Sequence, residues 1–218
     1  MLTQSISKNS LILTAFAVFT AGVLAVTFQS TKTKIAAEER KAAQRALLEI
    51  IPAEEHDNDL LADTWSIPTP LLPQLGLTSA SDIYIARSNN EPVAVIIPTT
   101  THDGYSGDIK MIVGIHVNGN IAGVRTLAHK ETPGLGDKID IKKSPWILSF
   151  NGKSLTQPAI EDWNVKKDGG VFDQFTGATI TPRATVRQVR ETLEFFQTHR
   201  TDILNTQTEK DHTTSTHP

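Results

Sequence analysis

MIVGIHVNGNIAGVRTL, residues 111–127, contains two apolar runs, Met111–Val117 and Ile121–Leu127, on either side of the tripeptide Asn118-Gly119-Asn120. An Asn-Gly step supplies the positive φ angles that a tight hairpin turn needs. Apolar runs of this length, bounded by turn residues, are typical of strands. The stretch therefore predicts an antiparallel β-hairpin in the middle of the chain.

A second hairpin is predicted immediately upstream. Asp82–Arg87 and Pro92–Ile97 are strand-like and flank the pair Asn89-Asn90, which is a turn signal of the same kind. Two successive hairpins predict an antiparallel sheet that continues from one to the other.

A helix is predicted after the sheet, over Pro182–His199. Its apolar residues recur at helical spacing on one face (Val186, Val189, Leu193 and Phe196). Pro182 suits the first helical position, which makes Thr181 the expected N-cap. The predicted fold class is α+β: an antiparallel sheet domain with flanking helices, preceded by one transmembrane helix.

The transmembrane helix is predicted from the uncharged run Leu11–Phe28. As a helix this run is about 27 Å long, close to the hydrocarbon thickness of a bilayer. A cleaved signal peptide has a shorter apolar region, about 7–15 residues, that ends in a small-x-small site. We expect a retained anchor.

The organisation along the chain follows from these elements. Residues 1–30 form the predicted anchor, and residues 31–81 a connecting segment. In that segment a helix is expected over Thr33–Ile51, before Pro52, and the four prolines of residues 52–81 predict irregular structure. Residues 82–205 form the folded domain, and the polar residues 206–218 a disordered tail.

Composition excludes several functions. The net charge of −3 gives no basic footprint for nucleic acid. The absence of cysteine removes the thiolate ligands of iron–sulfur clusters and of most structural zinc sites, and no two histidines have the i, i+4 spacing of a metal site. We expect no nucleic-acid partner and no metal, so any electron transfer requires an organic cofactor.

Two segments rich in small residues are the candidates for holding such a cofactor. HKETPGLG, residues 129–136, follows a predicted strand, and DQFTGATITP, residues 173–182, leads into the predicted helix. Glycine loops let backbone groups approach a flat ligand, and a helix N-terminus suits a phosphate. Each alone is equally well explained as a turn and an N-cap; together they fit a phosphorylated aromatic cofactor.

These residues also resemble a known family. The pattern Asp173-x-x-Thr176-Gly177-Ala178-Thr179-x-Thr181 resembles the attachment motif of covalent flavoproteins with an FMN-binding domain. Residues 129–136 resemble the second flavin-contacting loop of that family, and Gly104–Gly107, GYSG, also fits it. With one N-terminal anchor and this length, the chain resembles the G-subunit family of Rnf/Rsx ion-translocating electron transport complexes.

The resemblance implies a site and a role. A flavin transferase would link FMN through its phosphate to the hydroxyl of Thr179. The expected cofactor-binding residues are Thr179, Thr176, Gly177, Ala178 and Thr181 in one segment, and Glu131, Thr132, Gly134, Leu135 and Gly136 in the other. The implied role is electron relay among the other subunits of a membrane redox-driven ion translocase, without catalytic residues of its own.

The resemblance also implies a location: the bacterial inner membrane, with a single span and the C-terminal domain in the periplasm. Lysines and arginines follow the apolar run more often than they precede it, which by the positive-inside rule predicts a cytoplasmic domain. Long domains are exported largely regardless of flanking charge, so we expect the periplasmic location.

Two other functions remain open from the sequence. The equivalent FMN-carrying subunit of the sodium-translocating NADH:quinone reductase shares the attachment motif and the anchor. A non-catalytic, membrane-anchored assembly module, in which both glycine loops are purely structural, is the alternative from a different class.

Overall fold

The computed structural model describes residue 10 and residues 13–28, 30–31 and 47–205. The chain divides into two compact units, Met1–Ala43 and Gln44–Pro218. The predicted tail, residues 206–218, and most of the predicted connecting helix, residues 33–46, lie outside the described residues, and so do Leu11 and Ile12 of the predicted anchor.

In the first unit, residues 13–28 are helical. The large apolar side chains of this helix are exposed, among them Leu13, Phe16, Phe19 and Leu24. Within the described part of the chain, no helix combines the length and the apolar character needed to cross a membrane.

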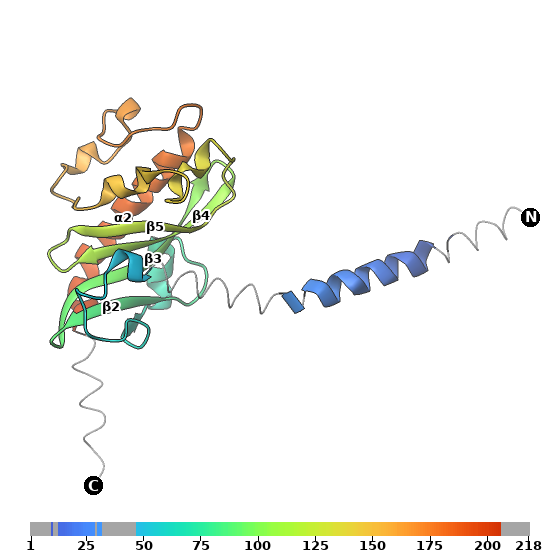
Figure 1. Ribbon diagram of the computed structural model, residues 1–218, viewed down its shortest axis with the longest axis horizontal. Helices are drawn as coiled ribbons and strands as arrows, with labels where there is room; N and C mark the ends of the chain where they lie inside the picture. The colour runs from blue at the N-terminus through green and yellow to red at the C-terminus, as the bar shows by residue number, and fades with distance from the viewer. Residues whose placement is uncertain (1–9, 11–12, 29, 32–46, 206–218) are drawn as a thin grey trace, which may run out of the picture. The chain divides into compact units, whose positions relative to one another are not determined.

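The second unit is built on a five-stranded antiparallel sheet in the order β1-β2-β3-β4-β5 (Figure 1). Its strands are β1 (Thr64–Ser66), β2 (Asp82–Ser88), β3 (Glu91–Gly104), β4 (Gly107–His116) and β5 (Ile121–Ala128). Both predicted hairpins are confirmed. Asn89 and Asn90 join β2 to β3 with φ angles of 52° and 67°, and Gly119 has a φ of 89° between β4 and β5.

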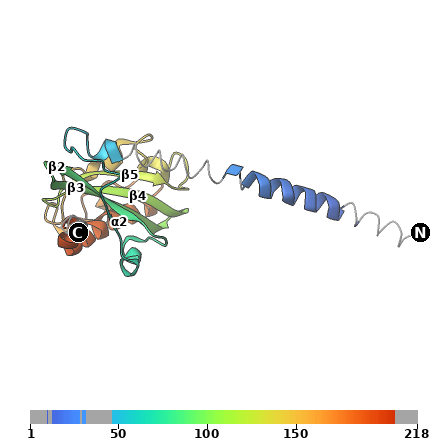
Figure 2. The same cartoon turned by 90° about the horizontal axis from the view of Figure 1, so that it is seen from below.

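Each face of the sheet carries its own core, because successive side chains of a strand point to opposite faces. Val95 and Ile97 of β3 belong to the larger core, which the long helix α2 (Ile180–Leu204) and the 3₁₀ helix η1 (Thr69–Leu75) cover. Figure 2 shows α2 on one side of the sheet. Ala94 and Ile96 point to the opposite face.

The core on that opposite face is completed by the residues at the start of the second unit, Leu47, Ile50 and Ile51, all of them buried. Gly114 of β4 and Gly123 of β5 are register partners. A Cβ on Gly114 would lie 2.1 Å from Cγ2 of Ile50. The two glycines therefore form a slot that admits the Ile50 side chain.

Residues 52–81 contain regular structure where the prolines predicted none. The strand β1 pairs with β2, with Trp65 opposite Ile83, and three residues are too few to show a periodic signal. The prolines help η1 to form, since Pro70 stands in its first turn, where an N–H has no helical partner. Residues 47–50 are helical and end before Pro52, as predicted.

Helix α2 begins earlier than predicted, and its N-cap is Thr179 rather than Thr181. Thr181 and Pro182 are the second and third helical residues instead. Proline is tolerated there because the first N–H groups of a helix have no intrahelical acceptor. Between β5 and α2 the chain forms four short 3₁₀ helices: η2 (Gly136–Ile139), η3 (Pro145–Phe150), η4 (Ile160–Asp162) and η5 (Lys166–Asp168).

Candidate functional site

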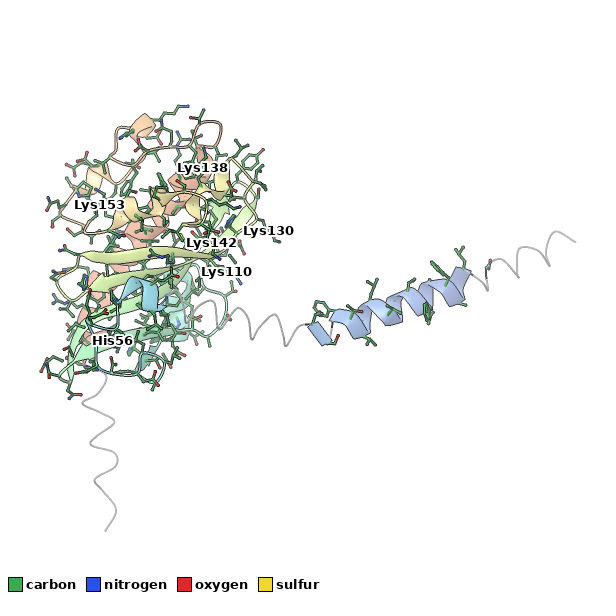
Figure 3. The ribbon with its side chains drawn as sticks, in the orientation of Figure 1. His56, Lys110, Lys130, Lys138, Lys142 and Lys153 are labelled. Carbon is green, nitrogen blue, oxygen red and sulfur yellow. The ribbon has the colours of Figure 1, made fainter. Side chains whose placement is uncertain are left out.

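The loop of residues 131–136 is shaped by a tight turn. Pro133 and Gly134 are its central residues, Gly134 has a φ of 79°, and the N–H of Leu135 donates to the carbonyl of Thr132 at 3.1 Å. Proline followed by a left-handed glycine is typical of a type II turn. The buried Asp137 accepts from the Gly134 N–H at 2.8 Å. The loop lies between Lys130 and Lys138, both labelled in Figure 3.

The segment before α2 contains a similar turn over Phe175–Ala178. The N–H of Ala178 donates to the Phe175 carbonyl at 3.1 Å, and Gly177 has a φ of 81°. Phe175 is buried in a small core with Ile109 and Met111 of β4 and Ile139 of η2. One apolar cluster therefore supports both glycine turns.

The two turns, about forty residues apart in sequence, meet in space. A Cβ on Gly177 would lie 3.4 Å from Cδ2 of Leu135. Between the segments is a cavity of about 400 Å³, within the size range of small-molecule sites. It is lined by Tyr105, Glu131, Thr132, Leu135, Gly136, Gly177, Ala178, Thr179, Ile180 and Thr181.

The cavity lining includes every residue expected from the sequence except Thr176 and Gly134. Thr176 is exposed on the turn, and Gly134 shapes the loop through its φ. Tyr105 and Ile180 were missed. Tyr105 is 69% exposed and Ile180 46% exposed. Tyr105 could have been found as an aromatic residue inside the glycine-flanked GYSG turn. Ile180 could have been found as an apolar residue at a polar helix start.

The three threonines before α2 have different environments. Thr181 is fully buried, and its hydroxyl donates to Oε2 of Glu131 at 2.5 Å. Thr179 is half-buried and lines the cavity, and among the described residues its side chain makes no capping hydrogen bond. Thr179 stands at the N-terminus of α2, where the helix dipole favours an anion.

Apolar surface completes the site. The side chains of Tyr105, Leu135 and Ile180 line the cavity and are each more than one-third exposed. Exposed apolar surface beside a helix N-terminus can bind a ligand with a flat apolar part and an anionic part.

Comparison with known proteins identifies the class and then the family. Residues 104–194 match the FMN-binding domain, and residues 1–50 match the RnfG N-terminal region. The chain is thus a protein with an FMN-binding domain, and every residue that lines the cavity lies inside the matched region.

Relatives that match nearly the whole chain identify the family within this class. The G subunit of the ion-translocating oxidoreductase complex from Shewanella amazonensis is 46% identical over 93% of both chains. Its counterpart from Vibrio vulnificus is 47% identical over 93% of this chain and 94% of the relative, and that from Pseudomonas aeruginosa is 46% identical over 92% and 93%. The chain belongs to the G-subunit family of ion-translocating oxidoreductase complexes.

The family is therefore the one that the sequence motifs resemble, since these three relatives, which match nearly the whole chain, bear that name. A crystal structure of NqrC from Shewanella oneidensis aligns with a TM-score of 0.39 and 21% identity over 66% of each chain.

Proposed function

We propose that this protein is a membrane-anchored flavoprotein subunit that relays electrons through FMN within an ion-translocating oxidoreductase complex. The supporting observation is the cavity where the two glycine turns meet, which Thr179 helps to line. When bound, FMN supplies reversible uptake and release of electrons. The chain itself binds and orients it, and the partners are the other subunits of the complex.

Thr179 would hold the flavin covalently, with a flavin transferase directing its Oγ1 to the flavin phosphate. Oγ1 would form the new P–O bond and give its proton to solvent. The bond between the two phosphates of a flavin dinucleotide would break, and the nucleoside monophosphate would leave. The resulting phosphodiester keeps one negative charge, which the N-terminus of α2 stabilises by about 0.3–1 kcal/mol.

Within the cavity the two segments have different tasks. Gly177 and Ala178 leave room for the phosphate end of FMN beside α2. Thr176 lies in the same turn, Phe175–Ala178, which leads into α2. Leu135 presents apolar surface to the ring, and Thr132, Gly134 and Gly136 shape the loop around it. Tyr105 and Ile180 extend this apolar surface.

The anchor is the uncharged run Leu11–Phe28, which spans the inner membrane once, with the flavin domain, which includes residues 47–205, in the periplasm. The exposed apolar side chains of the helix over residues 13–28 support this proposal. Apolar residues on all sides of a helix are expected where lipid is the solvent.

The test is peptide mapping after co-expression with a flavin transferase. The wild-type chain and a Thr176→Ala variant should carry the FMN mass on the peptide with Thr179, and Thr179→Ala should carry none. Thr179→Ser retains a hydroxyl and should be labelled. An adduct that survives in Thr179→Ala, or maps to Thr176, would refute the assignment. A wild-type chain with no adduct would favour the non-catalytic assembly module.

A further inference from the structure

Glu131 is a buried residue that lines the proposed flavin cavity. Glu131 is only 5% exposed, although the next four residues of its loop are all exposed. A carboxylate in such a place is retained only if hydrogen bonds compensate its lost hydration. The partners of its two oxygens therefore indicate what the residue does.

Both oxygens of Glu131 accept hydrogen bonds from other segments of the chain. Oε1 accepts from the backbone N–H of Ser106 at 3.0 Å, in the turn between β3 and β4. Oε2 accepts from the Thr181 hydroxyl at 2.5 Å, in the first turn of α2. Hydrogen bonds to a charged acceptor are about twice as strong as neutral ones.

Two glycines make room for this carboxylate. A Cβ on Gly136 would lie 2.6 Å from Oε2 of Glu131 and 2.8 Å from Oγ1 of Thr181. A Cβ on Gly104 would lie 2.9 Å from Oε1 of Glu131 and 2.3 Å from the carbonyl oxygen of Gly107. Neither glycine has a positive φ. Space, rather than backbone conformation, thus explains glycine at both positions.

We propose that Glu131 is a positioning residue, whose carboxylate fixes the β3–β4 turn, the 131–136 loop and the start of α2 around the flavin. It acts through protein groups rather than by contact of its carboxylate with the cofactor. The three segments joined in this way carry Tyr105, Leu135 and Ile180, the apolar side chains of the cavity. The inference rests on the proposed flavin function and deepens it.

The consequence concerns the environment of the flavin ring rather than its attachment. The ester bond to Thr179 tethers only the phosphate end, so the ring is held by the surrounding segments. If the link through Glu131 is lost, these segments separate and the ring gains freedom and water contact. The flavin spectrum and reduction potential should then change while the FMN adduct remains.

Three variants separate the hydrogen bonds from the charge. Glu131→Ala removes both links, and Thr181→Val removes one with almost no change of shape. Glu131→Gln removes the charge but preserves both links, because its amide oxygen accepts from Ser106 N–H and the Thr181 hydroxyl can turn to accept from the amide. Controls are Thr192→Val, which removes another fully buried α2 hydroxyl, and Glu194→Ala, a partly exposed carboxylate of α2.

The experiment measures the FMN adduct by intact mass, the visible absorption band, flavin fluorescence and the midpoint potential of the full-length protein. Glu131→Ala and Thr181→Val should retain the adduct, lose vibrational structure in the absorption band, gain fluorescence and shift the potential. Glu131→Gln and both controls should remain close to wild type.

The positioning role would be overturned if Glu131→Ala and Thr181→Val carry the FMN adduct and have the wild-type spectrum and midpoint potential. It would also be overturned if the spectrum and potential of Glu131→Gln match those of Glu131→Ala. If Glu131→Ala does not fold, the near-isosteric Thr181→Val decides alone. An unlabelled wild-type chain would instead refute the proposed function, so the two failures are distinguishable.

Discussion

Gly134 and Gly136 stand two residues apart in one loop and require glycine for different reasons. Gly134 has a φ of 79° and no described atom within 4 Å of an added Cβ, so Gly134→Ala costs only backbone strain, about 1 kcal/mol. Gly136→Ala forces a methyl group against Glu131 and Thr181, at about 1–3 kcal/mol. Urea unfolding should rank the variants in this order, and Gly136→Ala should alter the flavin spectrum more than Gly134→Ala. Equal spectra would contradict the steric reasoning.

His102 gives the stability of the domain a pH dependence. Its Nδ1 lies 2.8 Å from Oδ1 of Asp108, and Nε2 lies 3.1 Å from the carbonyl oxygen of Gly76. The hydrogen bond to Asp108 raises the pKa of His102, against a smaller effect of desolvation, and the same bond lowers the pKa of Asp108. Nearby Asp103 adds to the rise in the pKa of His102, and Lys110 and Lys130 add to the fall for Asp108.

The direction of the pH dependence follows from the difference between the folded and unfolded pKa values of each group. A raised histidine pKa contributes stability that is complete below the unfolded value, about 6.5, and is lost as pH rises through the folded pKa. The lowered carboxyl pKa contributes stability that is lost only in acid. His102→Gln should therefore destabilise the domain more at about pH 6 than at about pH 9. Unfolding curves at both pH values check this, and an equal loss at both would contradict it.

The prediction from the sequence that Thr181 is the N-cap of the helix was wrong, because the N-cap is Thr179. Thr181 was expected to cap the helix, and instead lies inside it with its hydroxyl bonded to Glu131, fifty residues away. The choice of N-cap depends on that distant partner, so local capping preference could not identify it. Asp137 was missed for a similar reason, since its role depends on the turn at Gly134.

Among the elements, η3 supports the segment that carries Thr179. Trp146 donates from Nε1 to the carbonyl of Asp173 at 2.7 Å, and its ring packs edge-to-face against Phe175 at 5.0 Å between centroids. Trp146→Phe removes the hydrogen bond and part of the contact, at about 1–3 kcal/mol. The variant should unfold at lower urea concentration and change the flavin spectrum. Trp65→Phe, a half-buried tryptophan of β1, should leave the spectrum as in wild type.

The elements also show what local patterns can predict. Both hairpins were found because Asn89-Asn90 and Asn118-Gly119 specify their turns within a few residues. The strand β1 was missed because it exists only through its pairing with β2. The meeting of the two glycine loops was expected from a family resemblance. Its physical cause, the shared core of Ile109, Met111, Ile139 and Phe175, is visible only in three dimensions.

For the whole molecule, the folded domain begins before the predicted boundary at residue 82. Leu47, Ile50 and Ile51 are each less than 5% exposed and belong to the core on the face of the sheet opposite α2. Deletion of residues 1–43 should give a domain that is soluble without detergent and accepts FMN. Deletion of residues 1–51 removes three buried aliphatic side chains, each worth about 2–5 kcal/mol, which exceeds the usual margin of stability.

The comparison of these two truncations is made by detergent-free yield, circular dichroism and flavin loading. A folded, loaded domain that lacks residues 1–51 would show that these residues are dispensable. A domain that lacks residues 1–43 and still needs detergent would argue against the anchor.

The slot between Gly114 and Gly123 has a mechanical consequence. Ile50 packs there on β4 and β5, and Leu47, which precedes it, is buried in the same core. Tension from the N-terminal side therefore acts on the face of the sheet over β4 and β5, and not on the hairpin ends, where paired strands separate one hydrogen bond at a time. The cavity, which Tyr105 lines just before β4 begins, lies beyond the opposite end of that strand from Gly114, so this tension is not applied to it while Ile50 stays packed.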